Sequence, residues 1–216
     1  MKALTLELGG NQLTLLAERG LWWAAQETLI LADLHLGKTA ILRRAGIPVP
    51  EGPDELTLQR IDQLIQKLNP QRLLLLGDVI HGSLQQHAEL IARLSAWRAT
   101  HAKLTFEAIV GNHDRHRAVI ESVIDWRAPQ TTEAGLIFCH EPPANVLSAP
   151  WLGGHWHPMA KLRAGIDTLR LPVFSLEPTQ GLVLPAFGEF TGGMDLSQCK
   201  GRQRFAVAND RVIAID

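Results

Sequence analysis

Asp33 and His35 stand two residues apart at the end of a short apolar run that begins at Leu29. A carboxylate and an imidazole are side chains that a borderline divalent cation accepts as ligands. In extended backbone, residues two apart point to the same side of a strand, so we expect both side chains to face one cation. The pair alone is weak evidence, because this spacing also occurs by chance in surface loops.

The same arrangement returns four times further along the chain. Each time, a short apolar run or a pair of glycines leads into a histidine, usually beside a carboxylate or an amide: Asp78 with His81, Asn112-His113-Asp114, His140, and His155 with His157. One histidine is more often structural than a ligand, but five repeats of one pattern favour a shared metal centre. Nitrogen and oxygen donors without thiolate indicate manganese, iron or zinc rather than magnesium alone. Cys139 is not a ligand candidate, because on a strand its side chain points away from that of His140.

Length and composition describe an ordinary globular protein. The chain has 216 residues, of which 46% are hydrophobic and 20% are charged, and its formal net charge is -1. We expect one domain over residues 1–216, without a general basic field for nucleic acid. The two cysteines form neither a disulfide framework nor a zinc motif, and no apolar stretch reaches about 18 residues. The sequence therefore predicts a cytoplasmic protein without a membrane partner.

The elements that must position these residues alternate between strand and helix in the first half of the chain. Apolar patterns and turn residues predict strands at 4–8, 13–16, 22–23, 29–32, 72–76 and 106–110, and helices at 54–68 and 83–97. Asp54 is placed to cap the first of these helices. Such alternation predicts a sheet covered by helices, with ligands bound beyond the strand ends.

The second half of the chain has a different character. Short apolar segments at 136–140, 173–174, 182–184, 205–207 and 212–215 are separated by Gly, Pro and Asp, and we expect them to form a second sheet. The predicted fold class is therefore α/β, with two mixed β-sheets packed face to face and helices outside. The sequence does not indicate a role for residues 188–204.

Basic residues follow the first pair of candidate ligands. The segment from Lys38 to Pro53 contains too much Gly and Pro for one regular element, so we expect a short helical piece and then an irregular loop. Loops that leave the carboxyl end of a strand often carry binding contacts. Lys38, Arg43 and Arg44 are therefore substrate candidates, with solvated surface charge as the alternative.

The ordered set Asp-x-His, Gly-Asp-x-x-His, Gly-Asn-His-Asp, His and Gly-His-x-His, over residues 28–158, resembles the motifs of the calcineurin-like metallophosphoesterase superfamily. The resemblance implies an αββα sandwich that holds two divalent metal ions, with Mn²⁺ as first choice and Fe²⁺ or Zn²⁺ as alternatives. It implies that the first ion is held by Asp33, His35 and His157, the second by Asn112, His140 and His155, and that Asp78 bridges them.

The chemistry implied by the resemblance is hydrolysis of a phosphodiester. A hydroxide that bridges the metals would attack phosphorus in line, and His113, oriented by Asp114, would aid departure of the leaving group. His81 would support a metal ligand from outside or contact a phosphate. Arg115 would bind a substrate phosphate.

Two nuclease families share more than the superfamily motifs with this chain. Ala-Asp-Leu-His-Leu-Gly at 32–37 and Gly-Asp-Val-Ile-His at 77–81 look like repair nucleases of the SbcD type, although the chain is too short for their additional regions. The runs at 111–115 and 153–157 look most similar to the bacterial ligase-associated DNA damage response endonucleases (PdeM). Membership would imply cutting of DNA in repair, with a DNA ligase, helicase or exonuclease as partner. The near-neutral charge predicts that DNA is engaged weakly, locally or with a partner's help.

Two other functions stay open at this point. A phosphodiesterase or pyrophosphatase acting on small nucleotides would use the same metals in a closed pocket. A non-catalytic interaction module on the same fold would show damaged motifs or lack His113, and neither is seen. Trp156, between two candidate ligands, could stack on a base or fill the core.

Overall fold

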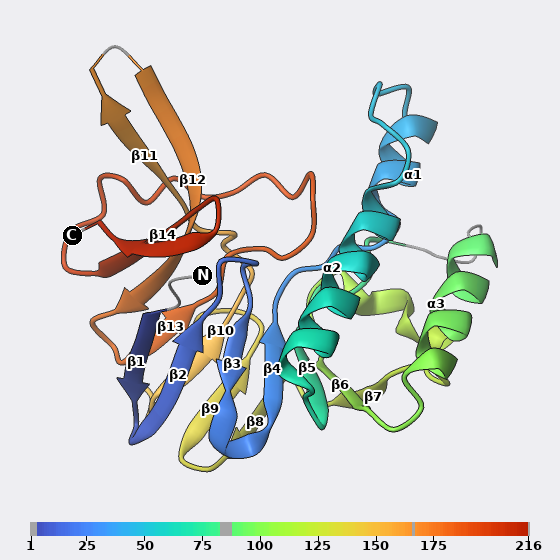
Figure 1. Ribbon diagram of the computed structural model, residues 1–216, viewed down its shortest axis with the longest axis horizontal. Coiled ribbons are helices and arrows are strands. Elements are labelled where there is room, and N and C mark those ends of the chain that lie inside the picture. The colour runs from blue at the N-terminus through green and yellow to red at the C-terminus, as the bar shows by residue number, and fades with distance from the viewer. Residues whose placement is uncertain (1–3, 83–87, 166, 216) are drawn as a thin grey trace.

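Two β-sheets face each other in the computed structural model of the protein, which describes residues 4–82, 88–165 and 167–215 (Figure 1). The first sheet has seven strands in chain order: β1 (Leu4–Leu8), β2 (Asn11–Leu15), β3 (Leu21–Trp23), β4 (Thr28–Leu31), β5 (Arg72–Leu76), β6 (Thr105–Ile109) and β7 (Asp125–Arg127). The first four strands form an antiparallel meander, and β4 to β7 run parallel. The carboxyl ends of the parallel strands therefore lie along one edge.

The parallel strands are buried on both faces, which explains their unbroken apolar sequence. Leu29 and Leu31 of β4 point into a core shared with the helices, whereas Ile30 points into a second core between the sheets. The same alternation holds along β5, where Leu73 and Leu74 belong to different cores. One strand thus anchors both layers, because successive side chains point to opposite faces.

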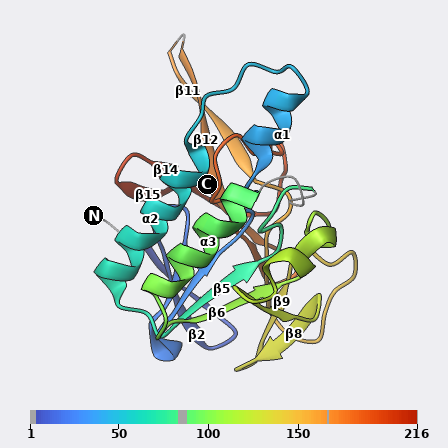
Figure 2. The same cartoon turned by 90° about the vertical axis from the view of Figure 1, so that its right-hand side faces the viewer.

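Helices cover the outer face of the first sheet. They are α2 (Pro53–Leu68) and α3 (Ala88–Thr100), whereas α1 (Lys38–Arg44) stands beyond the strand ends (Figure 1). The 3-10 turns are η1 (Ala24–Gln26) and η2 (Asp114–Ile120). Figure 2 shows α2 and α3 lying side by side over β5 and β6. The expected helices at 54–68 and 83–97 correspond to α2 and α3, although residues 83–87 lie outside the described residues.

The predicted cap of α2 is wrong. Gly52, with φ 98°, occupies the N-cap position, Pro53 follows it, and no side chain caps the helix. The carboxylate of Asp54 instead accepts hydrogen bonds from the backbone N–H of Gly37, at 3.2 Å to each oxygen. Asp54 therefore ties α2 to the loop that leaves the candidate ligands, because that N–H lies within reach of its side chain.

The second sheet contains β8 (Gln130–Glu133), β9 (Leu136–Cys139), β10 (Trp151–Gly153), β12 (Asp167–Glu177), β13 (Gly181–Val183), β14 (Gln203–Ala208) and β15 (Arg211–Ala214), in the order β15-β14-β12-β13-β10-β9-β8. Apolar side chains from both sheets form the core between them, including Leu15, Leu74, Phe138 and Phe174. The predicted class of two mixed sheets packed face to face is confirmed. One detail differs, because no helix is described between residues 121 and 215, so loops cover the outer face of the second sheet.

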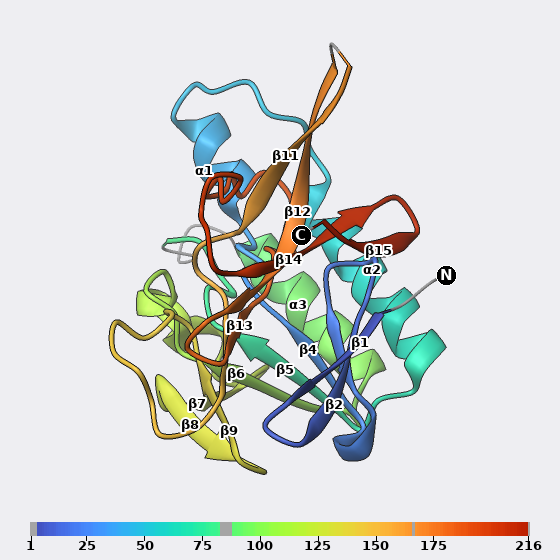
Figure 3. The ribbon, with the colours of Figure 1, turned by 90° about the vertical axis from the view of Figure 1, so that its left-hand side faces the viewer.

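A two-stranded arm extends beyond the second sheet (Figures 1 and 3). It consists of β11 (Met159–Ala164) and the antiparallel first part of β12, and we call residues 159–165 and 167–172 the arm. In Figure 1 the arm and α1 rise at the same end of the molecule, on opposite sides. None of the described helices has the length and apolar character needed to cross a membrane.

Candidate metal centre

The loops that follow β4 and β5 bring the first candidate ligands together. The N–H of Asp33 donates to Gly77 O at 3.2 Å, and the N–H of His35 donates to Asp78 O at 2.9 Å. Asp33 and His35 have left-handed backbone, with φ 55° and 49°, and β4 has already ended at Leu31. The expectation of an extended strand at these two residues is therefore wrong. Their side chains converge because the left-handed turns redirect them.

Left-handed backbone recurs among the candidate ligands. Asp78, His155 and His157 also have positive φ, at 49°, 69° and 47°. Such a conformation costs about 1–3 kcal/mol for a residue with a side chain and persists only when the surroundings enforce it. Strain of this kind concentrates at functional sites, and here it coincides with the residues whose side chains can bind a cation.

Asp33, His35 and His157, here called the first group, lie close together in the interior. Nε2 of His35 lies 3.2 Å from Nε2 of His157, which in turn lies 3.6 Å from Oδ1 of Asp33. Asp33 is 0% exposed and His35 is 3% exposed. Ligand atoms of these three side chains all lie within 4.8 Å of one another, a spacing that one metal ion could bridge.

Asn112, His140 and His155, here called the second group, meet next to the first. Oδ1 of Asn112 lies 2.9 Å from Nε2 of His140 and 3.1 Å from Nδ1 of His155. Asn112 is exposed and His155 is partly exposed, whereas His140 is buried. The second group therefore opens toward solvent.

Asp78 lies between the two groups. Its Oδ2 is 3.7 Å from Nε2 of His35 and 3.3 Å from Nε2 of His140. The backbone N–H of His113 donates to the other oxygen at 2.8 Å and fixes the carboxylate. Among the predicted ligands, Asp78 has the position expected of a residue shared by two ions.

The donor atoms fit divalent cations. Nδ1 of His140 lies 2.9 Å from the carbonyl oxygen of Leu76, so Nδ1 carries the proton and the lone pair of Nε2 faces Asn112 and Asp78. Nδ1 of His157 lies 3.1 Å from Thr191 O, which exposes Nε2 in the same way. Lone pairs that face one another repel unless a cation lies between them. Histidines held by carbonyl groups through the opposite ring nitrogen are the usual form of metal ligands.

Burial and charge set the protonation of these side chains. Burial of His35, reinforced by neighbouring histidines and Lys38, outweighs the attraction of Asp78 and lowers its pKa to about 2. Burial also acts to lower the pKa of His140, but while no cation is bound the carboxylates of Asp78 and Asp33 raise it to about 9, so a cation that binds Nε2 displaces a proton from that atom. Burial would raise the pKa of Asp78, yet His140, His35 and the N–H of His113 bring it down to about 2. The carboxylate of Asp78 thus remains ionised and attracts positive charge to this point.

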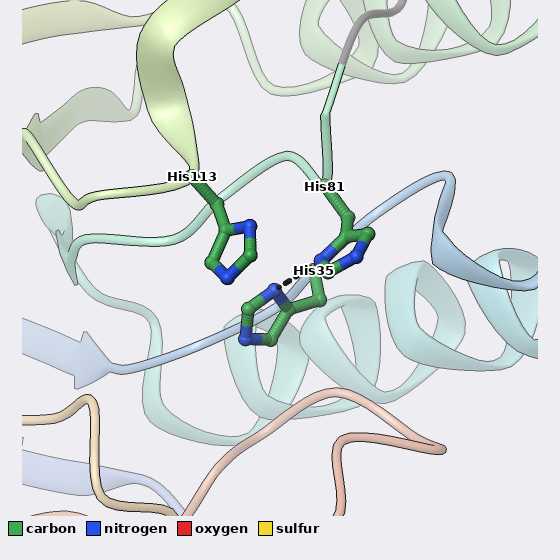
Figure 4. Close-up of side chains that lie close together, drawn as sticks. All are labelled: His35, His81 and His113. Atoms are coloured by element: carbon green, nitrogen blue, oxygen red, sulfur yellow. Dashed lines mark hydrogen bonds between the residues drawn. The ribbon is translucent and has the colours of Figure 1, made fainter. Parts of the chain in front are cut away.

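Three histidine rings form a cluster beside the first group (Figure 4). Nδ1 of His81 lies 3.1 Å from Nδ1 of His35, and the rings of His81 and His113 stack with centroids 4.4 Å apart. Burial and the charge of His113 lower the pKa of His81 to about 4. If Nε2 of His35 binds a cation, its Nδ1–H donates to a neutral His81. This places His81 where the sequence analysis expected an outer partner of a ligand.

The carboxylate of Asp114 does not orient the ring of His113. Its two oxygens accept hydrogen bonds from the backbone N–H groups of Ile80, at 3.1 Å, and Gly111, at 2.8 Å. Asp114 is fully buried, and its two oxygens accept hydrogen bonds from backbone groups of two different loops. The predicted contact between Asp114 and the ring of His113 is therefore wrong. Asp114 instead fixes the backbone turn that carries His113, and the ring of His113 stacks on that of His81.

Two glycines permit close approach to the groups. A Cβ atom on Gly154 would lie 2.5 Å from Oδ2 of Asp33, and one on Gly77 would lie 2.5 Å from Nδ1 of His140. Both distances are shorter than van der Waals contact. Any larger residue at Gly154 or Gly77 would therefore clash with a candidate ligand. The positive φ of Gly77 also favours glycine at that position.

The substrate candidates divide by position. Lys38 is partly buried, its Nζ lies 3.4 Å from Thr191 O, and burial lowers its pKa despite the nearby Asp78. Arg43 and Arg44 are exposed and line another cavity of about 740 Å³, whose wall includes carboxylates from α2 and α3 and none of the candidate ligands. Arg115 is exposed on η2. The structure therefore brings Lys38 to the centre and leaves Arg43 and Arg44 outside it.

Sequence reasoning missed the segment that supports His157. Thr191 O lies near both His157 and Lys38, and the N–H of Gly188 donates to Asp33 O at 3.1 Å. Residues 188–191 make these contacts through backbone atoms, so their residue types do not reveal them in the sequence. Trp156 packs on the buried residues Cys139 and Trp151 at the outer face of the second sheet, which favours its structural interpretation.

Comparisons with known proteins show the family to which the chain belongs. The model of the calcineurin-like phosphoesterase family matches residues 27–148. The chain is similar to the Pseudomonas putida nuclease MPE over 99% of this chain and 100% of that one, with 31% identity and a TM-score of 0.84. It is also similar to YfcE, a phosphoesterase from E. coli, over 87% of this chain and 96% of that one, with 17% identity and a TM-score of 0.45. No curated protein matches the chain.

Proposed function

Because the chain belongs to the calcineurin-like phosphoesterase family, whose members hydrolyse phosphate esters with divalent metals, we propose that it is a two-metal endonuclease that cuts DNA. The observation that carries this proposal is the position of Asp78 between two groups of nitrogen and oxygen donors. A pair of adjacent sites that share one carboxylate suits a reaction in which two cations act on one phosphate.

The first group would hold one ion and the second group the other, with Asp78 shared. When bound, the two ions supply an acidified water and neutralise the negative charge that develops on the phosphate oxygens. Asp33 and Asp78 together contribute two negative charges, so two divalent ions leave a net positive site. Mn²⁺ is our first choice, because mixed imidazole, amide and carboxylate ligation suits it, with Fe²⁺ or Zn²⁺ as alternatives.

We propose that His113 assists departure of the leaving group. Its backbone N–H holds Asp78, while its ring stacks on His81 and lies 5.1 Å from the ring of His35. This position supports its role as the donor of a proton to the departing oxygen, or as a partner that stabilises its charge. Lys38, which lies near His35 and Asp78, would attract the phosphate of the substrate.

DNA as substrate is supported by the likeness to a nuclease along the whole chain. It is also supported by the second group, because Asn112 and His155 are accessible and a polymer can reach them. On the basis of the resemblance to the PdeM endonucleases, we also propose a role in DNA repair, with a DNA ligase, helicase or exonuclease as partner.

Nicking of circular DNA tests the proposal, because circles have no ends for an exonuclease. Wild type and His113→Ala are compared on closed-circular plasmid and on circular single-stranded DNA in Mn²⁺, with hydrolysis of a chromogenic phosphodiester measured in parallel. Wild type should cut at least one kind of circle. His113→Ala should lose about 10²-fold or more in rate while metal analysis finds both ions retained.

A second histidine provides the matched control. His116 is exposed on η2, three residues from His113, so His116→Ala should retain cleavage. Turnover of the chromogenic diester without cleavage of circles would reject the endonuclease and favour a phosphodiesterase or pyrophosphatase acting on small nucleotides. Loss of metal from His113→Ala would show that His113 is a ligand.

A further inference from the structure

A small cavity adjoins the first group on the side of the arm. It measures about 170 Å³, and its lining includes His157, Phe190 and Thr191 together with Met159 and Pro172 of the arm. The side chain of Phe190 is 47% exposed, so its ring is accessible to a ligand. The cavity is smaller than the ~300–1,000 Å³ of pockets that enclose a whole drug-sized ligand, so it suits one flat ring system.

The register of the arm decides which side chains continue this cavity. Met159 pairs with Pro172, Lys161 with Arg170, and Arg163 with Thr168. Because directly opposed residues share a face, and every second residue stays on it, these six side chains form one face of the arm. The face begins at the cavity, since Met159 and Pro172 belong to the lining.

The opposite face of the arm has another role. Ala160 lies in a small core with Val173 and Ala206, and Leu162 and Leu171 pack against that core. The apolar face is thus directed toward the second sheet. Consequently, the face that carries Lys161, which we call the basic face, stays available to a ligand.

Charge on the basic face is not balanced. Lys161 and Arg170 stand directly opposite each other, an arrangement of like charges that destabilises a sheet. Lys161 reaches Asp195 at 2.8 Å, but Arg170 donates to the carbonyl of Gly193, and Arg163 makes no ion pair with a described residue. Three cations therefore face a single carboxylate.

The charged side chains of the cavity wall balance each other. Arg19 and Glu189 both line the cavity and form an ion pair at 2.7 Å, and Glu189 also binds Arg60 at 2.5 Å. The positive charge along this path therefore comes from the arm. An exposed aromatic ring followed by a row of cations is the combination with which proteins hold single-stranded nucleic acid.

We propose that the cavity at Phe190 and the basic face of the arm form a binding track for single-stranded DNA. One base beside the scissile phosphate stacks on Phe190, and the flanking phosphates pass Arg170, Lys161 and Arg163. A base can stack on a side chain only after it leaves its duplex neighbours, so the track selects a single strand. The inference rests on the proposed function and names the form of DNA that the same site accepts.

Salt dependence of cleavage tests the basic face. The kcat/KM for a single-stranded oligonucleotide is measured between about 50 and 200 mM salt, because each phosphate contact contributes about 0.7 to the slope of log affinity against log salt. Arg163→Gln should lower this slope by about 0.7. Lys103→Gln is the control, because Lys103 is exposed and precedes β6, at the end of the strand remote from the centre.

Substitution of the ring tests the cavity. Phe190→Leu should lower the ratio of kcat/KM for single-stranded DNA to that for a small chromogenic diester by about 5-fold or more, since stacking is lost. Phe190→Tyr should restore the ratio, because it retains an aromatic face. Turnover of the small diester reports whether each variant is folded and loaded with metal.

The outcomes separate the two proposals. If wild type cuts single-stranded DNA, but Arg163→Gln keeps the wild-type slope and Phe190→Leu keeps the wild-type ratio, the track is rejected and the endonuclease stands. An equal loss on both substrates in Phe190→Leu would also reject it, since that result points to displacement of His157. If wild type hydrolyses the diester and no DNA, the endonuclease fails and the track fails with it.

Discussion

The first and second groups contain the same number of side chains but differ in depth and charge. Asp33 and His35 of the first group are 0% and 3% exposed, whereas Asn112 of the second group is exposed. The first group has its own carboxylate. The second has an amide in the corresponding place and depends on Asp78 for negative charge.

This difference has a physical consequence for metal binding. A buried carboxylate attracts a cation more strongly than an exposed amide, because the amide carries no net charge and water screens the exposed site. The backbone N–H of His155 also donates to both oxygens of Asp33, at 3.1 Å and 2.9 Å, so a second-group residue fixes a first-group ligand. We expect the first group to retain its ion longer during chelation, and the exchangeable ion to be that of the second.

Asp78→Asn should have the largest effect, because the carboxylate is shared. The variant removes one negative charge from both groups, and stabilisation of the phosphate charge worth several kcal/mol is lost with the ions. We expect kcat/KM for a phosphodiester to fall about 10³-fold or more, since each 1.36 kcal/mol is a factor of ten. Metal analysis should show that binding is weakened at both groups.

Asp125→Asn supplies the control for this prediction, because Asp125 is an exposed carboxylate at the start of β7. Loss of only one ion from Asp78→Asn would contradict a shared carboxylate and would assign Asp78 to a single group.

His81→Phe should affect the first group alone. The variant keeps an aromatic ring to stack on His113 but removes the Nδ1 acceptor that lies 3.1 Å from Nδ1 of His35. Outer partners of this kind change metal affinity or activity by about 10- to 100-fold. Titration with a chelator should show earlier loss of the first ion.

The exposed His116 provides the matched variant, His116→Phe, which should titrate like wild type. Unchanged affinity in His81→Phe would show that His35 does not need this acceptor, and would leave His81 with a contact to substrate.

Asn112→Asp should reduce the difference between the groups. The substitution is nearly isosteric and gives the second group a carboxylate of its own. We expect the exchangeable ion to bind about 10-fold more tightly, because affinity for divalent cations rises with the charge of the ligands. Activity should fall by a similar factor, since the net positive charge that attracts phosphate is lower.

Calorimetric titration of Mn²⁺ into metal-depleted protein would measure both affinities. If Asn112→Asp tightens binding of the ion held by the first group, and not of the ion held by the second group, Asn112 is a ligand of the first ion.

The strands and the main helices could be predicted because their signals are local. Leu29–Leu31 and Leu73–Leu76 are apolar at every position, which is the pattern of parallel strands buried on both faces. The cap of α2 and the contact of Asp114 could not be predicted in this way. Asp54 and Asp114 have backbone donors from other loops within reach, and only the folded chain places those donors there.

The sequence by itself determined the chemistry of this protein, because residue types and their spacing define which atoms can bind a cation and at which strand ends they stand. The tertiary structure decided how those atoms meet. Left-handed turns direct Asp33 and His35, carbonyl oxygens of Leu76 and Thr191 set the ring nitrogens of two histidines, and the register of the arm collects its cations on one face. These features depend on backbone conformation and on contacts between distant segments, which residue types do not specify.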